Sequence, residues 1–102
     1  MQHYTQDEAI AYECAREAIT HLLAVLTEQI TEEAAKTNPN AALVAALRDE
    51  RSRLFNERKN LHVEDHVAIA RIRTEYGTRI RSWNEQFETR RHLHLEDPAT
   101  IA

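Results

Sequence analysis

Apolar residues recur at spacings of three and four along the first third of the chain, which is typical of one buried face on an α-helix. Thr5 and Glu8 have the spacing of a capping box, in which the two side chains satisfy backbone N–H groups at the start of a helix. Pro39 ends the pattern, because the residue before a proline avoids the α region. We therefore expect a first helix at about residues 6–36, with an apolar face made of Tyr12, Ala15, Ile19, Leu22, Leu23, Val25, Leu26 and Ile30.

A second helix is expected at about residues 39–60, with proline at its first helical position. Two arginines, Arg51 and Arg58, interrupt its apolar stripe at positions where apolar residues are expected. The face that this helix presents to its neighbours is therefore half polar. The apolar members of the stripe are Val44, Leu47, Leu54 and Leu61.

The third helix is expected at about residues 64–91 and has the clearest stripe, formed by Ile69, Ile72, Tyr76, Ile80, Trp83 and Phe87. Gly77 lies beside this stripe, and a glycine inside a helix costs about 1 kcal/mol relative to alanine. It therefore either permits a close helix approach or marks a kink. No strong helix breaker lies between Asn60 and Val63, so a short break and one continuous helix both stay open. Residues 92–102 form a tail.

These patterns predict an all-α fold with a single domain over residues 1–102, an elongated, coiled-coil-like bundle of about three long antiparallel helices. One glycine and two prolines are too few for the turns of a β-protein. At about 1.5 Å per residue, the first and third helices would each be roughly 40 Å long. Such helices are long for a chain of 102 residues, so we expect a homodimer that packs along the first or third helix.

The net charge of −4 is unevenly distributed along the chain. Residues 1–36 carry seven acidic side chains and two basic ones, which gives −5, whereas the remainder carries eleven basic and ten acidic side chains, which gives +1. Complementary helices, in one chain or in two copies, explain this asymmetry without an external partner.

Arginines border the apolar stripe of the third helix on both sides and are candidate interaction residues. One side carries Arg71, Arg79 and Arg90, and the other carries Arg73, Arg81 and Arg91. Coiled coils place charges at such flanking positions, where they pair with acids on a neighbouring helix. Nucleic-acid binding needs one continuous patch with net positive charge, so we do not expect it for this acidic chain.

Arg51 and Arg58 are further candidate interaction residues, because an arginine in a helix seam needs a carboxylate or an anionic ligand to offset its desolvation. We expect the partner to be an acid of the first helix, either Glu17 or Glu28. The alternative is an anion pocket between the helices, as in small all-α enzymes that hold dicarboxylates with buried arginines.

Histidines provide the candidate metal ligands. His62 and His66 are four residues apart, which on a helix would present two imidazoles to one metal ion. In an up-down-up bundle the third helix starts beside the first, which would bring Cys14 and Glu13 toward them. Neither an HExxH motif nor a Glu-x-x-His pair is present, so we expect no cofactor. Cys14, a lone cysteine on an acidic helix, is expected to pack rather than to react.

The most apolar run, Leu22 to Leu26, is far too short to cross a bilayer, and the first residues lack the features of a signal peptide. We therefore expect a cytoplasmic protein without membrane association. Its predicted function is that of a non-enzymatic protein–protein interaction module, such as an adaptor, a chaperone-like protein or a phage- or plasmid-type regulator or inhibitor. The alternative is a metal-binding or anion-binding bundle, including an enzymatic one, that uses His62 and His66 or Arg51 and Arg58.

Overall fold

The computed structural model of the chain describes residues 4–95, without the side chains of residue 87 and of residues 89–95. It contains three α-helices, α1 (Gln6–Ala34), α2 (Ala41–Asn60) and α3 (His66–Leu95). No strand occurs within the described residues. The prediction of an all-α, three-helix fold is therefore confirmed. None of the described helices has the length and apolar character of a membrane span.

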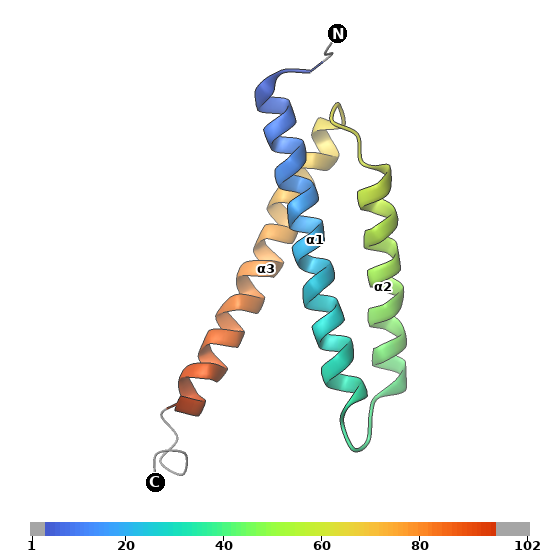
Figure 1. Cartoon of the computed structure of the whole chain (residues 1–102), viewed down its shortest axis with the longest axis vertical. Helices are drawn as coiled ribbons and strands as arrows, with labels where there is room; N and C mark the ends of the chain where they lie inside the picture. The colour runs from blue at the N-terminus through green and yellow to red at the C-terminus, as the bar shows by residue number, and fades with distance from the viewer. Residues whose placement is uncertain (1–3, 96–102) are drawn as a thin grey trace.

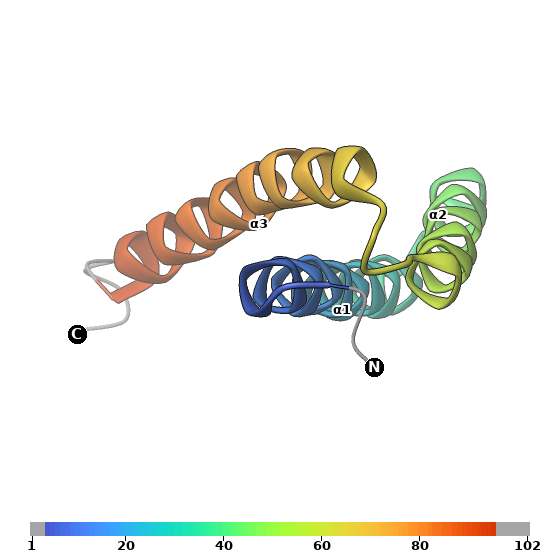
Figure 2. The same cartoon turned by 90° about the horizontal axis from the view of Figure 1, so that it is seen from above.

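The three helices form an elongated bundle with extents of 64 × 30 × 18 Å. The chain reverses direction at each connection, so α2 is antiparallel to its two neighbours and α3 runs parallel to α1 (Figure 1). Helix α1 packs against both α2 and α3, whereas the described backbones of α2 and α3 stay apart. Seen from above, α3 lies on one side of the α1–α2 pair and leaves the opposite side uncovered (Figure 2). Helix α1 is thus the centre of the fold.

The starts of α1 and α2 follow from local side-chain chemistry. The Thr5 hydroxyl accepts a hydrogen bond from the backbone N–H of Glu8 at 3.1 Å, and Glu8 accepts one from the N–H of Thr5 at 2.9 Å. The predicted capping box is therefore confirmed. Beyond α1, the side chain of Asn40 accepts from Leu43 N at 3.1 Å and caps α2. Pro39 consequently lies outside α2, and the expected start of this helix at Pro39 was wrong.

A break between α2 and α3 settles the question that the sequence left open. Leu61 adopts an extended backbone, with φ −72° and ψ 134°, and its side chain is buried in the core. Asp65 then caps α3, since its carboxylate accepts from Ala68 N at 3.4 Å. The chain therefore turns over residues 61–65 without glycine or proline, because burial of Leu61 and the Asp65 cap take the place of a helix breaker.

The predicted apolar stripes form the core, but their residues are buried to different extents. The largest fully buried side chains are those of Ile19, Leu22, Leu26 and Ile72. Along α3, burial is complete at Ile72 and falls to half-buried at Ile80 and Trp83. The predicted core position Phe87 lies outside the described side chains. Among the described side chains of the α3 stripe, burial thus decreases from Ile72 toward Trp83.

Gly77 on α3 is not a site of close helix approach. A methyl group built at this position would meet only the end of the Arg81 side chain, at 3.4 Å, and the backbone there is ordinary helix. Of the two readings that the sequence allowed for this glycine, the structure therefore rules out the tight contact between helices.

Replacing Gly77 with alanine is expected to raise the free energy of unfolding by about 0.5 to 1 kcal/mol, because alanine restricts the unfolded chain and loses nothing in the helix. Urea denaturation followed by circular dichroism measures the change. A variant less stable than the wild type would show that Gly77 has a packing role that the geometry does not reveal.

Candidate interaction surfaces

The seam between α2 and α3 consists of long polar side chains. Arg71 Nη2 lies 2.7 Å from Glu57 Oε2, and Arg79 Nη2 lies 2.6 Å from Glu50 Oε1. The Tyr76 hydroxyl donates a short hydrogen bond to the same Glu57 carboxylate. Burial raises the pKa of Tyr76, and the bond to Glu57 raises it further; Glu57 also raises the pKa of Arg71. The expected interhelical pairing of α3 arginines is thus present on this side.

The arginines on the other side of the α3 stripe are arranged differently. Arg81 donates to the Thr78 hydroxyl of its own helix at 3.2 Å, and neither Arg73 nor Arg81 forms an ion pair with any described side chain. The reason is geometric, because α2 flanks α3 on one side only. Arg90 and Arg91 lie outside the described side chains.

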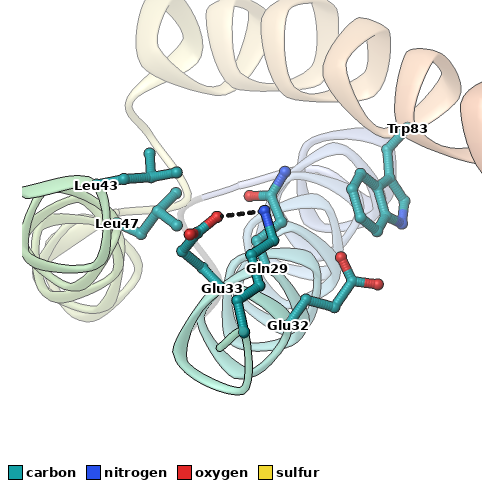
Figure 3. Close-up of a pocket in the computed structure, with 7 residues that line it drawn as sticks. Gln29, Glu32, Glu33, Leu43, Leu47 and Trp83 are labelled. Atoms are coloured by element: carbon teal, nitrogen blue, oxygen red, sulfur yellow. Dashed lines mark hydrogen bonds and ion pairs between the residues drawn. The ribbon is translucent and has the colours of Figure 1, made fainter. Parts of the chain in front are cut away.

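A hollow of about 200 Å³ opens where α3 diverges from the other two helices. We call it the open cleft and define it by its lining residues, Gln29, Glu32, Glu33, Lys36, Leu43, Leu47 and Trp83. In Figure 3, Leu43 and Leu47 of α2 form one wall, Trp83 of α3 forms the other, and side chains of α1 lie between them. The walls are apolar and the floor is polar.

One of the two floor carboxylates of the open cleft is already used by the fold. Glu33 is buried, and its oxygens accept from Lys36 Nζ at 2.8 Å and from Asn40 N at 3.0 Å. These bonds, that to Lys36 above all, lower the pKa of Glu33. Glu33 therefore ties the α1–α2 connection together. Glu32 is exposed and forms no ion pair with a described residue.

Arg51 and Arg58 do not bind the carboxylates that the sequence suggested. Arg58 Nη1 donates to the Thr20 hydroxyl at 2.8 Å, and Arg51 Nη1 donates to the Thr27 hydroxyl at 3.3 Å. The expectation of Glu17 or Glu28 as the partner was wrong, because the α1 positions that face these arginines are occupied by threonines. The arginines lie two turns apart, so they do not converge on one anion pocket.

The histidine hypothesis rested on a helix that does not include His62. Helix α3 begins at His66, so His62 lies in the preceding connection rather than one turn earlier on the same helix. His66 Nε2 lies 2.6 Å from Glu8 Oε2, and Cys14 is a free, half-buried thiol. Among the side chains that the structure describes, no three from His, Cys, Asp or Glu are grouped so that they could hold a metal ion.

The contact between Glu8 and His66 joins the starts of α1 and α3, as the up-down-up arrangement predicted. The hydrogen bond from the Thr5 backbone lowers the pKa of Glu8 below its ordinary value of 4.5, and His66 lowers it further. The ionised carboxylate is thus favoured in the folded state. Its contribution to stability is complete above the ordinary pKa and is lost as the pH falls through the lowered one.

Glu8→Gln is therefore expected to flatten the loss of stability that sets in as the pH falls below the ordinary pKa of 4.5. Urea denaturation at a series of pH values measures this slope. Glu85→Gln, at an exposed position of α3, serves as the control and should keep the wild-type profile. An unchanged slope in Glu8→Gln would contradict the assigned role of Glu8.

Comparisons of the chain with protein-family models, with curated proteins and with solved structures gave no match. The functional argument therefore rests on the surfaces described above.

Proposed function

We propose that this chain is a non-enzymatic protein–protein interaction module whose open cleft binds one amphipathic helix of another protein. The observation that carries the proposal is the loss of cover along α3. Ile72 has 0% of its surface exposed, whereas Trp83, on the same stripe, is only half-buried and stands across the open cleft from Leu43, which is 41% exposed.

The arrangement of the helices supports a helix as the ligand. Helix α1 forms the floor of the open cleft, and α2 and α3 supply walls whose backbones stay apart. Ion pairs to Glu57 and Glu50 connect the walls nearer the α2–α3 connection. A fourth helix on the floor would contact both walls and complete a four-helix arrangement, the usual way to bury such faces.

The lining residues specify the chemistry of the bound helix. Apolar residues at positions i, i+3 or i+4, and i+7 would contact Leu43, Leu47 and Trp83. A lysine or arginine beside this stripe would pair with Glu32, and an amide would suit Gln29. We propose no chemical step in the cleft, since both oxygens of Glu33 already accept hydrogen bonds. Binding such a helix is the expected activity of an adaptor, a chaperone-like protein or a regulator or inhibitor of another protein.

The test uses a displayed library of amphipathic helical peptides of about five turns, selected on the folded chain. Trp83 is the only tryptophan, so its fluorescence reports directly on the open cleft. Selected peptides should shift this emission and should bind Leu43→Glu at least about tenfold more weakly, a difference of about 1.4 kcal/mol.

The matched control is Val67→Glu, which places the same charge at an exposed apolar position of α3 and should keep wild-type affinity. A library that yields no binder, or binders that ignore Leu43→Glu and leave Trp83 emission unchanged, would refute the open cleft as the binding site.

A further inference from the structure

The side of the α1–α2 pair that faces away from α3 has a charge pattern that the proposed function does not use. We call this side the outer face (Figure 2). The contacts of Arg51 and Arg58 with α1, and of Glu50 and Glu57 with α3, fix the orientation of α2. At 3.6 residues per turn, the outer face includes Ile10, Glu13, Glu17, His21, Ala24, Glu28 and Thr31 on α1 and Arg48, Arg51, Phe55, Arg58 and Lys59 on α2.

Opposite charges lie on neighbouring helices of the outer face but do not pair. Its α1 half carries three carboxylates, and its α2 half carries four cations. None of these groups forms an ion pair with a side chain that the structure describes. Thr20 and Thr27 lie between the two helices and accept the hydrogen bonds of the two half-buried arginines. Neither guanidinium group therefore pairs with a carboxylate among the described side chains, so their partial desolvation is incompletely compensated.

Phe55 adds an apolar centre to the basic half of the outer face. Its side chain is 49% exposed, and the Arg58 guanidinium lies over its ring, 5.2 Å from the ring centroid. On α1, the residue at the corresponding height is Ala24, which is small and exposed. On the outer face, an aromatic ring thus projects from α2, whereas α1 carries only a small side chain at the same height.

We propose that the outer face binds the outer face of a second copy of this chain, related by a two-fold axis that runs parallel to the helices. This rotation places the acidic half of α1 from each copy over the basic half of α2 from the other. A two-fold axis across the helices would instead superpose like charges, which is unfavourable. The interface is isologous, so each complementary contact occurs twice.

The contacts within one chain fix the register of the dimer. A two-fold axis parallel to the helices leaves the height of every residue unchanged. Arg51 is level with Thr27, so it meets the partner's Glu28. Arg58 is level with Thr20, within one turn of the partner's Glu17.

The apolar residues fall into the same register. Phe55, midway between the two arginines, is level with Ala24 and therefore packs on Ala24 of the partner subunit. The carboxylates that Arg51 and Arg58 lack within the chain are thus supplied by the second copy.

The size of the outer face suits a reversible dimer. Helix α2 has 20 residues, so it is about 30 Å long, and two helices side by side are about 20 Å wide. The area buried is then roughly 1,200 Å² over both subunits, the lower limit for a specific complex. We therefore expect a dissociation constant in the micromolar range that rises at least about tenfold between 0.05 M and 1 M salt, since exposed ion pairs are screened.

The experiment is a charge exchange followed by sedimentation equilibrium of the full chain. The variants Arg51→Glu/Arg58→Glu and Glu17→Arg/Glu28→Arg each place like charges in the proposed contacts, and each alone should be monomeric. Mixed in equal amounts, they should form a heterodimer, because every proposed contact again joins opposite charges. Recovery of the heterodimer also shows that both variants fold. The matched control is Arg73→Glu/Arg81→Glu, an equal change of charge on α3, which should stay dimeric.

Three results would overturn the proposal: a wild-type chain that is monomeric at about 100 μM in low salt, charge-reversed variants that still dimerise alone, or a mixture that stays monomeric. A monomeric wild-type chain that binds polyglutamate through Arg51 and Arg58 would assign the basic half to an acidic partner instead of a second copy.

Discussion

Replacing Ile72 with alanine is expected to lower the free energy of unfolding by about 3 to 4 kcal/mol, the largest effect of any single change considered for this chain. Ile72 is fully buried and belongs to the core cluster that joins α3 to α1. Because the interior is close-packed, its neighbours can fill only part of the space that the lost side chain leaves. A domain of this size has a total stability of about 5 to 15 kcal/mol, so the variant should approach the limit of folding.

Urea denaturation followed by circular dichroism, at one fixed protein concentration, measures this loss. Val67→Ala on the same helix is the control, since Val67 is 83% exposed and its truncation should change stability by less than about 0.5 kcal/mol. Equal effects of the two substitutions would show that α3 is not held to α1 through Ile72.

The second large effect is expected for Glu57→Gln, which should lower the free energy of unfolding by about 1 to 2 kcal/mol. Glu57 accepts from both Arg71 and Tyr76 and so links α2 to α3. Glutamine keeps the shape of the side chain but removes the charge and one acceptor oxygen. The estimate is kept modest because water screens a partly exposed pair.

The titration of Tyr76 provides a second readout. Its pKa is raised by burial and by the bond to Glu57 above an ordinary value of 10.0, so this group stabilises the fold below about pH 10 and loses that contribution as the pH rises through the raised pKa. Glu57→Gln should lower the pKa of Tyr76 while burial still keeps it raised. Glu75→Gln removes a more exposed acceptor of Arg71 and should leave the tyrosine titration unchanged; a shift in that control would argue against the role given to Glu57.

The helices could be predicted from sequence because their causes are local. A threonine and a glutamate three residues apart sufficed for the start of α1, and the apolar spacing identified Ile19, Leu22 and Ile72 as core residues. The turn after α2 was harder, because burial of Leu61 is a tertiary event. The sequence did contain a signal for the start of α3. Aspartate is a common residue at helix starts, and the Asp65 carboxylate accepts from the N–H of Ala68, three residues later.

The contacts of the candidate sites depend on rotation about each helix axis, which the sequence constrains poorly. Thr20 and Thr27 were overlooked as partners of Arg58 and Arg51 because a charged residue suggests a charged partner. A spacing of seven in both pairs was the signal that could have revealed them. The role of Glu33 was also missed, since its two donors come from the connection that it organises.

The central position of α1 has a consequence for the order in which the chain folds. Only the short connection at residues 35–40 separates α1 from α2 in the chain, whereas the contact from Glu8 to His66 joins residues that are 58 positions apart. Short loops close at a smaller entropic cost and on shorter timescales. We expect the α1–α2 hairpin to form while α3 is still unstructured, so the newly made chain would expose the apolar side of α1 until α3 docks on it.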